Sequence, residues 1–170
     1  SEYELSRRIL VGLFKYRDAI NSVRNPAMFS YEIPVPSEEE AKTMNQDDIQ
    51  YYGVSKAYQN RWEKVHEQRT YLYADQLEAE AIWGCELNEL FKTLFALERE
   101  LFILVRNYLI LMDPKANEAR KNAIIKRDKK SRDVMYDESA DEPDEFKQEL
   151  LDAIGHIENY LKPKLSHEVA

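Results

Sequence analysis

Hydrophobic residues recur at steps of three and four along most of the chain, which is the spacing of an α-helix. In the first segment they are Leu5, Ile9, Leu13, Tyr16, Ile20 and Val23. Ser1 and Glu4 have the spacing of a capping box, and Asn25-Pro26 disfavours helix before the proline. The pattern therefore predicts a first helix that begins at once and ends near Arg24.

Two long periodic segments follow, at about 47–83 and 86–112, and only Gly84 and Cys85 separate them. Glycine commonly ends a helix, so these residues predict a tight turn and a long antiparallel hairpin. The second segment has a stripe of leucines and also a second stripe on its surface. That stripe comprises Phe91, Phe95, Glu98, Phe102, Val105 and Leu109. A helix that is apolar on two stripes contacts more than one neighbour, which predicts a central position.

The remaining segments lack this regular pattern. Residues 25–46 are polar and proline-containing, which predicts a long loop. Residues 113–142 form a charged excursion, in which Asp113 and Pro114 have the pattern of a helix N-cap followed by an N1 proline. A last amphipathic helix follows the excursion and is expected to end at Pro163.

These elements predict one all-α domain over residues 1–170, an antiparallel bundle of four to five helices. The hydrophobic fraction of 44% is ordinary for a folded protein, and four glycines are too few for a β-rich one. A net charge of −8 disfavours general nucleic-acid binding. Cys85 is the single cysteine, which excludes an intrachain disulfide and suits a reducing compartment such as the cytoplasm. No apolar run reaches the length of a membrane span.

The charged excursion and the start of the last helix divide into a basic part and an acidic part. Residues 115–132 have a net charge of +6, and residues 137–152 have a net charge of −7. The basic part has the composition of a surface for anionic lipid or nucleic acid. Because the acidic part follows at once, we favour pairing between the two parts, or a plain solvated excursion.

One stretch, YYGVSKAYQNRWEKVHEQRTYL (51–72), combines residues that are used in catalysis and metal binding. Glu63 and His66 form an ExxH pair, which in di-iron carboxylate bundles supplies metal ligands. That chemistry requires a second ExxH pair and further glutamates on facing helices. Neither of the other histidines, His156 and His167, has a glutamate three residues before it, so the pair is half a site and we expect no metal or other cofactor.

Arg61 and His66 have the R-x4-H spacing of ribonucleases of the HEPN class, which are also small helical bundles. This resemblance implies that the two side chains handle the 2′-hydroxyl and the scissile phosphate. The chain is rich enough in arginine for such spacings to arise by chance, and the pair lies in the middle of the second helix. A helical ribonuclease is therefore the alternative to a non-catalytic interpretation.

The structural interpretation of the same stretch concerns Arg69. This residue lies at a position that faces the next helix, and pairing equidistant from the turn places it near Glu98 and Glu100. Burial of an unpaired arginine is costly, so a pair with one of these carboxylates is expected to fix the register of the hairpin. On this view Arg69→Leu leaves the fold as stable or more stable, whereas Glu98→Leu destabilises it.

Four segments resemble a group of uncharacterised bacterial proteins in which a membrane-spanning helix precedes a cytoplasmic helical domain. They are LFKYRDAINSVRNP (13–26), AYQNRWEKVHEQ (57–68), AIWG (81–84) and IENYLKPKL (157–165). The resemblance implies a tether to the inner membrane through a segment before residue 1, and it implies no activity. We therefore expect a non-catalytic interaction or scaffold domain that binds an unknown protein partner or a second copy of itself.

Overall fold

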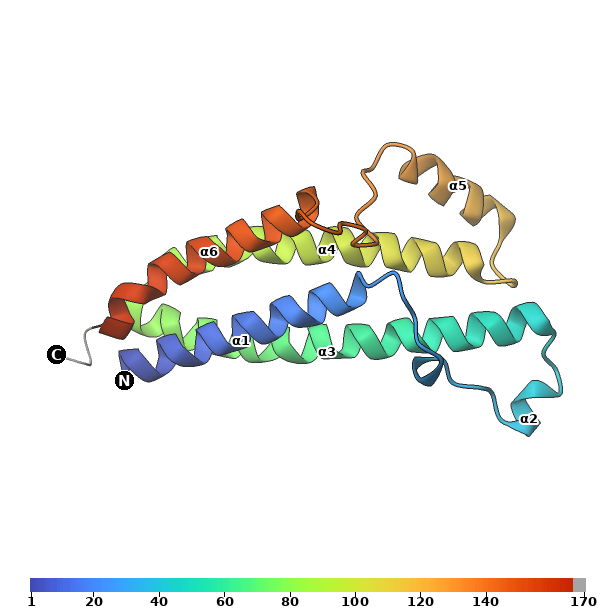
Figure 1. The fold of residues 1–170 in the computed structure, drawn as a ribbon, viewed down its shortest axis with the longest axis horizontal. Coiled ribbons are helices and arrows are strands. Elements are labelled where there is room, and N and C mark those ends of the chain that lie inside the picture. The colour runs from blue at the N-terminus through green and yellow to red at the C-terminus, as the bar shows by residue number, and fades with distance from the viewer. Residues whose placement is uncertain (167–170) are drawn as a thin grey trace.

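The computed structural model describes residues 1–166, so the last four residues of the predicted domain lie outside the described part. Within that part every regular element is helical, which confirms the all-α prediction (Figure 1). The elements are α1 (Glu2–Val23), a 3-10 helix η1 (Ser30–Glu32), α2 (Glu38–Ala41), α3 (Gln46–Trp83), α4 (Glu86–Met112), α5 (Glu118–Asp128) and α6 (Glu145–Ser166).

Four of these helices, α1, α3, α4 and α6, lie side by side, and successive members run antiparallel (Figure 1). α3 and α4 form the long hairpin and meet at Gly84, whose φ of 84° requires glycine. At the same end, the Trp83 indole donates to Glu2 at 2.6 Å and its ring lies 6.3 Å from that of Tyr160. The start of α1 and the end of α6 therefore sit beside the turn of the hairpin.

The hydrophobic core lies between the α3–α4 hairpin and the layer formed by α1 and α6. Its residues follow the helical period of the sequence, because each helix buries one stripe against its neighbours. The core includes Leu5, Ile9, Leu13, Tyr16 and Ile20 from α1, Val65, Leu72 and Ala79 from α3, Leu87, Phe91, Leu94 and Leu101 from α4, and Phe146, Leu150, Ile154, Ile157 and Leu161 from α6.

Two segments that connect the long helices differ from the sequence expectation. The 25–46 loop contains η1 and α2, because Ser37 forms a capping box with Glu40. In the excursion, Asp113 is the C-cap of α4, and α5 begins only after Asn117, whose side chain accepts from two backbone N–H groups. In each segment a short helix begins at a local N-cap, Ser37 for α2 and Asn117 for α5.

The last helix does not end at Pro163, as expected, but continues to Ser166. A proline removes one helical hydrogen bond, yet the final turn gains a contact that the sequence pattern did not indicate. The Lys164 ammonium lies 4.4 Å from the centre of the Trp83 ring and 5.0 Å from that of Tyr160. These cation–π contacts hold the turn against the end of α3.

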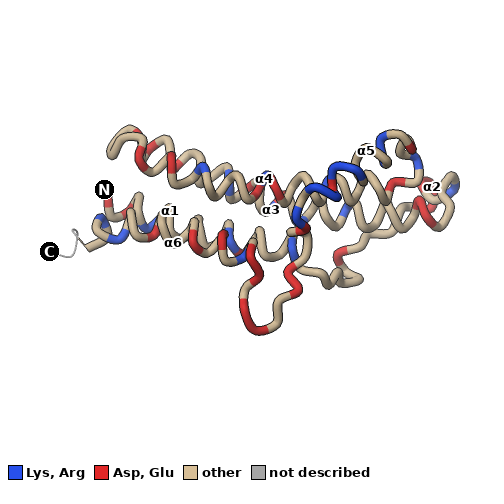
Figure 2. Tube along the Cα trace, turned by 90° about the horizontal axis from the view of Figure 1, so that it is seen from above, with Lys and Arg blue, Asp and Glu red and all other residues tan. Residues whose placement is uncertain are grey.

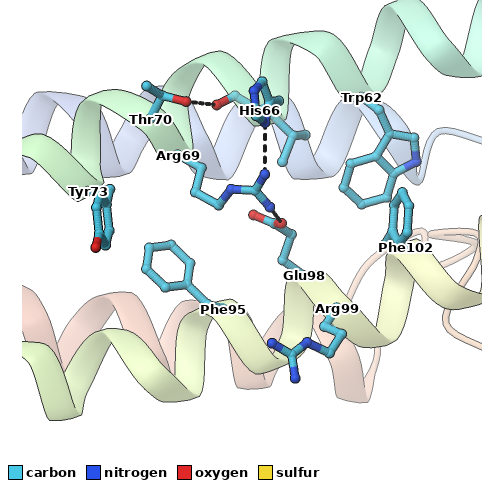
Figure 3. Close-up of a pocket in the computed structure, with 10 residues that line it drawn as sticks. Trp62, His66, Arg69, Thr70, Tyr73, Phe95, Glu98, Arg99 and Phe102 are labelled. Carbon is cyan, nitrogen blue, oxygen red and sulfur yellow. Dashed lines mark hydrogen bonds and ion pairs between the residues drawn. The ribbon is translucent and has the colours of Figure 1, made fainter.

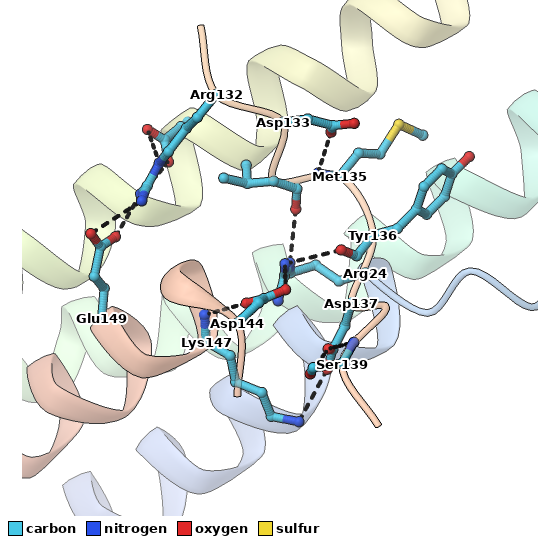
Figure 4. A network of polar contacts seen from close by, with 12 residues as sticks. Arg24, Arg132, Asp133, Met135, Tyr136, Asp137, Ser139, Asp144, Lys147 and Glu149 are labelled. Atoms are coloured by element: carbon cyan, nitrogen blue, oxygen red, sulfur yellow. Dashed lines mark hydrogen bonds and ion pairs between the residues drawn. The ribbon is translucent and has the colours of Figure 1, made fainter. Parts of the chain in front are cut away.

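The end of α1 is fastened to the segment before α6 by a fully buried arginine (Figure 4). Arg24 donates to the carbonyl oxygens of Val134 at 2.8 Å and Tyr136 at 3.2 Å, and to the Asp144 carboxylate at 2.6 Å. Its guanidinium also stacks over Phe146, 4.5 Å from the ring centre. One side chain therefore joins α1, the acidic segment and α6.

Within residues 1–166, no helix combines the length and the apolar character that crossing a bilayer requires.

Candidate functional site

Arg61, one member of the predicted catalytic pair, is buried and only 5% exposed. Its guanidinium donates to both carboxylate oxygens of Glu32, at 2.8 and 3.1 Å. It also donates to the carbonyl oxygens of Asn25 at 2.9 Å and Ala27 at 2.7 Å. The side chain thus holds the 25–32 segment against α3. The Arg61 hydrogen bond is also the main cause of the lowered pKa of the Glu32 carboxyl.

His66 is exposed and lies five residues further along α3, which is about 140° around a helix. It faces the α3–α4 groove, whereas Arg61 faces the loop, and the two side chains line different depressions of the surface. A pair that acts on a phosphodiester must share one accessible site. The structure does not bring Arg61 and His66 together in such a site.

Glu63 and His66 both lie on the exposed surface of α3 and line a shallow depression together with Lys64. Within the described residues, no group of three or more His, Cys, Asp or Glu side chains is placed to hold a metal ion. Among residues 1–166, the ExxH pair therefore has no third side chain beside it that could complete a metal site.

Arg69 and Glu98 are in contact, as the distances from the hairpin turn had indicated (Figure 3). Glu98 accepts from Arg69 on the groove side and from the Tyr16 hydroxyl, at 2.8 Å, on the core side. Burial, with the nearby carboxylate, raises the pKa of Tyr16 far above its usual value, so its phenol remains a donor. The second Arg69 nitrogen lies 2.8 Å from His66 Nδ1. Glu100, the other candidate, instead pairs with Arg132 at 2.7 Å.

The two members of the Arg69–Glu98 pair differ in burial in the opposite sense to the expectation. The side chain of Glu98 is 7% exposed, whereas that of Arg69 is 40% exposed. The sequence placed Arg69 at the seam, but Tyr16 of α1 covers Glu98 and not the arginine. The expectation for Arg69→Leu therefore changes from neutral to destabilising, whereas Glu98→Leu would still remove the acceptor of the buried Tyr16 hydroxyl.

We expect Arg69→Leu to lower the free energy of unfolding by roughly 2 kcal/mol, because it leaves a buried carboxylate with only the Tyr16 donor. Glu98→Gln keeps an acceptor for Tyr16 and removes the charge, so its cost is expected to be about 1 kcal/mol or less. Urea unfolding of both variants measures this difference. An Arg69→Leu protein as stable as the wild type would show that Glu98 needs no cationic partner.

Around this pair lies a groove of about 670 Å³ between α3 and α4, with α1 and α6 behind it (Figure 3). Its walls are mainly aromatic. Trp62 and Phe102 form an edge-to-face pair with ring centres 5.4 Å apart, and Phe95 and Tyr73 line the other end. Phe102 is 45% exposed and Tyr73 is 58% exposed. The groove is thus an apolar channel with a charged floor.

The charged side chains that line the groove are one carboxylate, Glu98, and two arginines, Arg69 and Arg99. Glu98 is already engaged by Arg69, while Arg99 lines the rim and Arg106 lies two turns further along α4. Both of these arginines are exposed, and within residues 1–166 neither forms an ion pair. The Trp62 indole N–H is buried and has no hydrogen-bond acceptor in the described part of the protein. The groove therefore offers donors and positive charge.

The groove was not predicted from the sequence, although half of its residues belong to patterns that the sequence shows. Phe95, Glu98 and Phe102 were assigned to a second stripe that should face a neighbouring helix. In the described structure these three residues line the groove, whereas Phe91 and Val105 of the same stripe are buried in the core. The stripe was therefore visible in the sequence, but the sequence did not show which of its residues a neighbouring helix covers.

No family model, no curated protein and no solved structure matches this chain. The resemblance to membrane-tethered bacterial proteins, and the tether that it implies, stay predictions.

Proposed function

We propose that the protein is a non-catalytic interaction domain whose α3–α4 groove binds an amphipathic helix rich in acidic residues. The observation that supports this proposal is an apolar groove with a cationic rim on a protein of net charge −8. Large exposed apolar patches on a soluble surface are characteristic of binding sites.

The shape of the groove favours a helix as the occupant. Two antiparallel helices leave a channel into which a third helix fits, with apolar anchors at positions i, i+3 or i+4, and i+7. Trp62, Phe95 and Phe102 would pack against those anchors, and Arg99 would lie beside the polar edge of the bound helix. Tryptophan, tyrosine and arginine are the residue types that dominate binding energy at interfaces.

The charge of the groove favours an acidic partner over a second copy of this chain. In a twofold-symmetric dimer the same surface patch meets itself. Such a dimer through the groove would bring Arg99 and Arg106 close to the same residues of the other copy, which opposes association. Glutamate or aspartate on a partner helix would instead pair with these arginines.

The experiment is a selection from a displayed library of helical peptides with a fixed apolar face and randomised polar positions. Acidic peptides are expected to be enriched on the wild-type protein. Phe102→Ala and Arg99→Ala should each weaken binding of an enriched peptide by about tenfold, as expected for interface residues that cost more than 1 kcal/mol.

One control variant matches the apolar change at Phe102, and another matches the loss of charge at Arg99. Ile103→Ala removes an exposed apolar side chain next to Phe102, and Arg7→Ala removes an exposed arginine of α1. Neither should alter binding. Enrichment of peptides without acidic bias, equal loss in the control variants, or a concentration-dependent dimer that Phe102→Ala abolishes would each contradict the proposal.

A further inference from the structure

The basic segment does not pair with the acidic segment, except through one residue. Arg132 contacts Glu100, Glu145 and Glu149. The other cations of α5 and its flanking loops form no ion pair within residues 1–166. They are Lys115, Arg120, Lys121, Lys126, Arg127, Lys129 and Lys130.

Figure 2 shows these Lys and Arg residues along α5, with the acidic loop before α6 on the opposite side of the molecule in that view. Residues 115–132 have a net charge of +6 in a chain of net −8, so the other residues together carry −14. The charges are therefore segregated, and a basic surface stands clear of the acidic one.

α5 is held in a defined orientation on the end of α4. Ile124 is buried, and Asn107 donates to Asp128 at 3.2 Å. Ile125, the next residue along the helix, is 44% exposed and is followed by two cations, Lys126 and Arg127. The outer face of α5 is thus basic around one exposed apolar side chain.

We propose that the outer face of α5 binds an anionic lipid surface. Clusters of lysine and arginine are attracted to acidic headgroups, and an apolar side chain on the same face enters the boundary beneath them. Nucleic acid would use the cations but not Ile125, and residues 115–132 contain no aromatic side chain on which bases could stack. The proposal goes beyond the groove, because it depends on different residues.

The experiment is co-sedimentation of the full chain with vesicles of phosphatidylcholine in which about a third of the lipid is phosphatidylserine. Wild-type protein should sediment with these vesicles, should not sediment with pure phosphatidylcholine, and should be released at high salt. Because each cation near the surface contributes about fivefold, Lys126→Ala/Lys129→Ala/Lys130→Ala should bind about a hundredfold more weakly. Ile125→Ser should lose about fivefold.

The matched control replaces three exposed lysines elsewhere, Lys15, Lys64 and Lys162, with alanine, and it should sediment like the wild type. Phe102→Ala should also sediment normally, which separates this proposal from the groove. Equal binding by the α5 triple variant, or equal binding to neutral vesicles, would overturn the proposal. The proposal would also be overturned if no vesicle sedimented the protein and an oligonucleotide bound through α5 with an affinity that Ile125→Ser did not change.

Discussion

Replacing Arg61 with alanine is expected to lower the free energy of unfolding by about 3–5 kcal/mol, the cost of removing one partner of a buried ion pair. The change leaves Glu32 without its bidentate partner, with 18% of that side chain exposed, and it also frees the carbonyl oxygens of Asn25 and Ala27. Urea unfolding measures the loss. Glu63→Ala, an exposed change less than one turn away on α3, is the control and should have little effect.

The Arg61 variant should also respond differently to acid. The pKa of Glu32 is lowered in the folded protein, so its contribution to stability is present above the ordinary glutamate pKa of about 4.3 and is lost as the pH falls. Arg61→Ala removes the largest cause of that lowered pKa and leaves the Phe29 N–H and the charge of Lys64, so most of the contribution is absent at every pH. The difference between the two proteins should therefore narrow in acid, and a constant difference from neutral to acidic pH would contradict the role of the Glu32 pair.

Replacing Arg24 with alanine is the second change with a large expected effect, about 3 kcal/mol or more. The side chain is 1% exposed, and its loss would leave two carbonyl oxygens and Asp144 without their donor and a gap over Phe146. The free energy of unfolding is again the measurement.

Two further variants test why Arg24 matters. Arg24→Lys keeps the charge but cannot reproduce a planar fork that reaches three acceptors, so it should recover only part of the loss. Arg7→Ala on the exposed side of α1 should have little effect. If Arg24→Lys were fully stable, charge alone would explain the site and the carbonyl contacts would contribute nothing.

The hairpin could be predicted from the sequence because its signals are local. The helical period of α3 and α4 and the glycine at position 84 act over a few residues, and the bounds of both helices agree with the expectation to within one residue. Equal distances to the turn also placed Arg69 near Glu98 and Glu100, and the contact is with Glu98. Which of the two is buried did not, because that depends on Tyr16 of another helix.

The roles of Arg24 and Arg61 could not be predicted in the same way. Their partners include backbone carbonyl groups, and for Arg24 these lie 110 and 112 residues away in sequence. Every residue has such a carbonyl, so no pattern of side chains identifies the few that remain free after folding. Arg61 was therefore interpreted beside His66, its sequence neighbour, although its contacts are with Glu32 and the loop.

The proposal of a groove that binds a helix is tested most directly by the two tryptophan indole signals in a nitrogen–proton correlation spectrum. Trp62 lies in the groove, and Trp83 lies about 30 Å further along α3 at the turn of the hairpin. Addition of an acidic helical peptide selected on the wild-type protein should shift the Trp62 indole signal, identified by its absence in Trp62→Phe. The Trp83 signal should stay in place. A shift confined to Trp83, or saturable binding that moves neither signal, would contradict the assignment of the groove as the binding site.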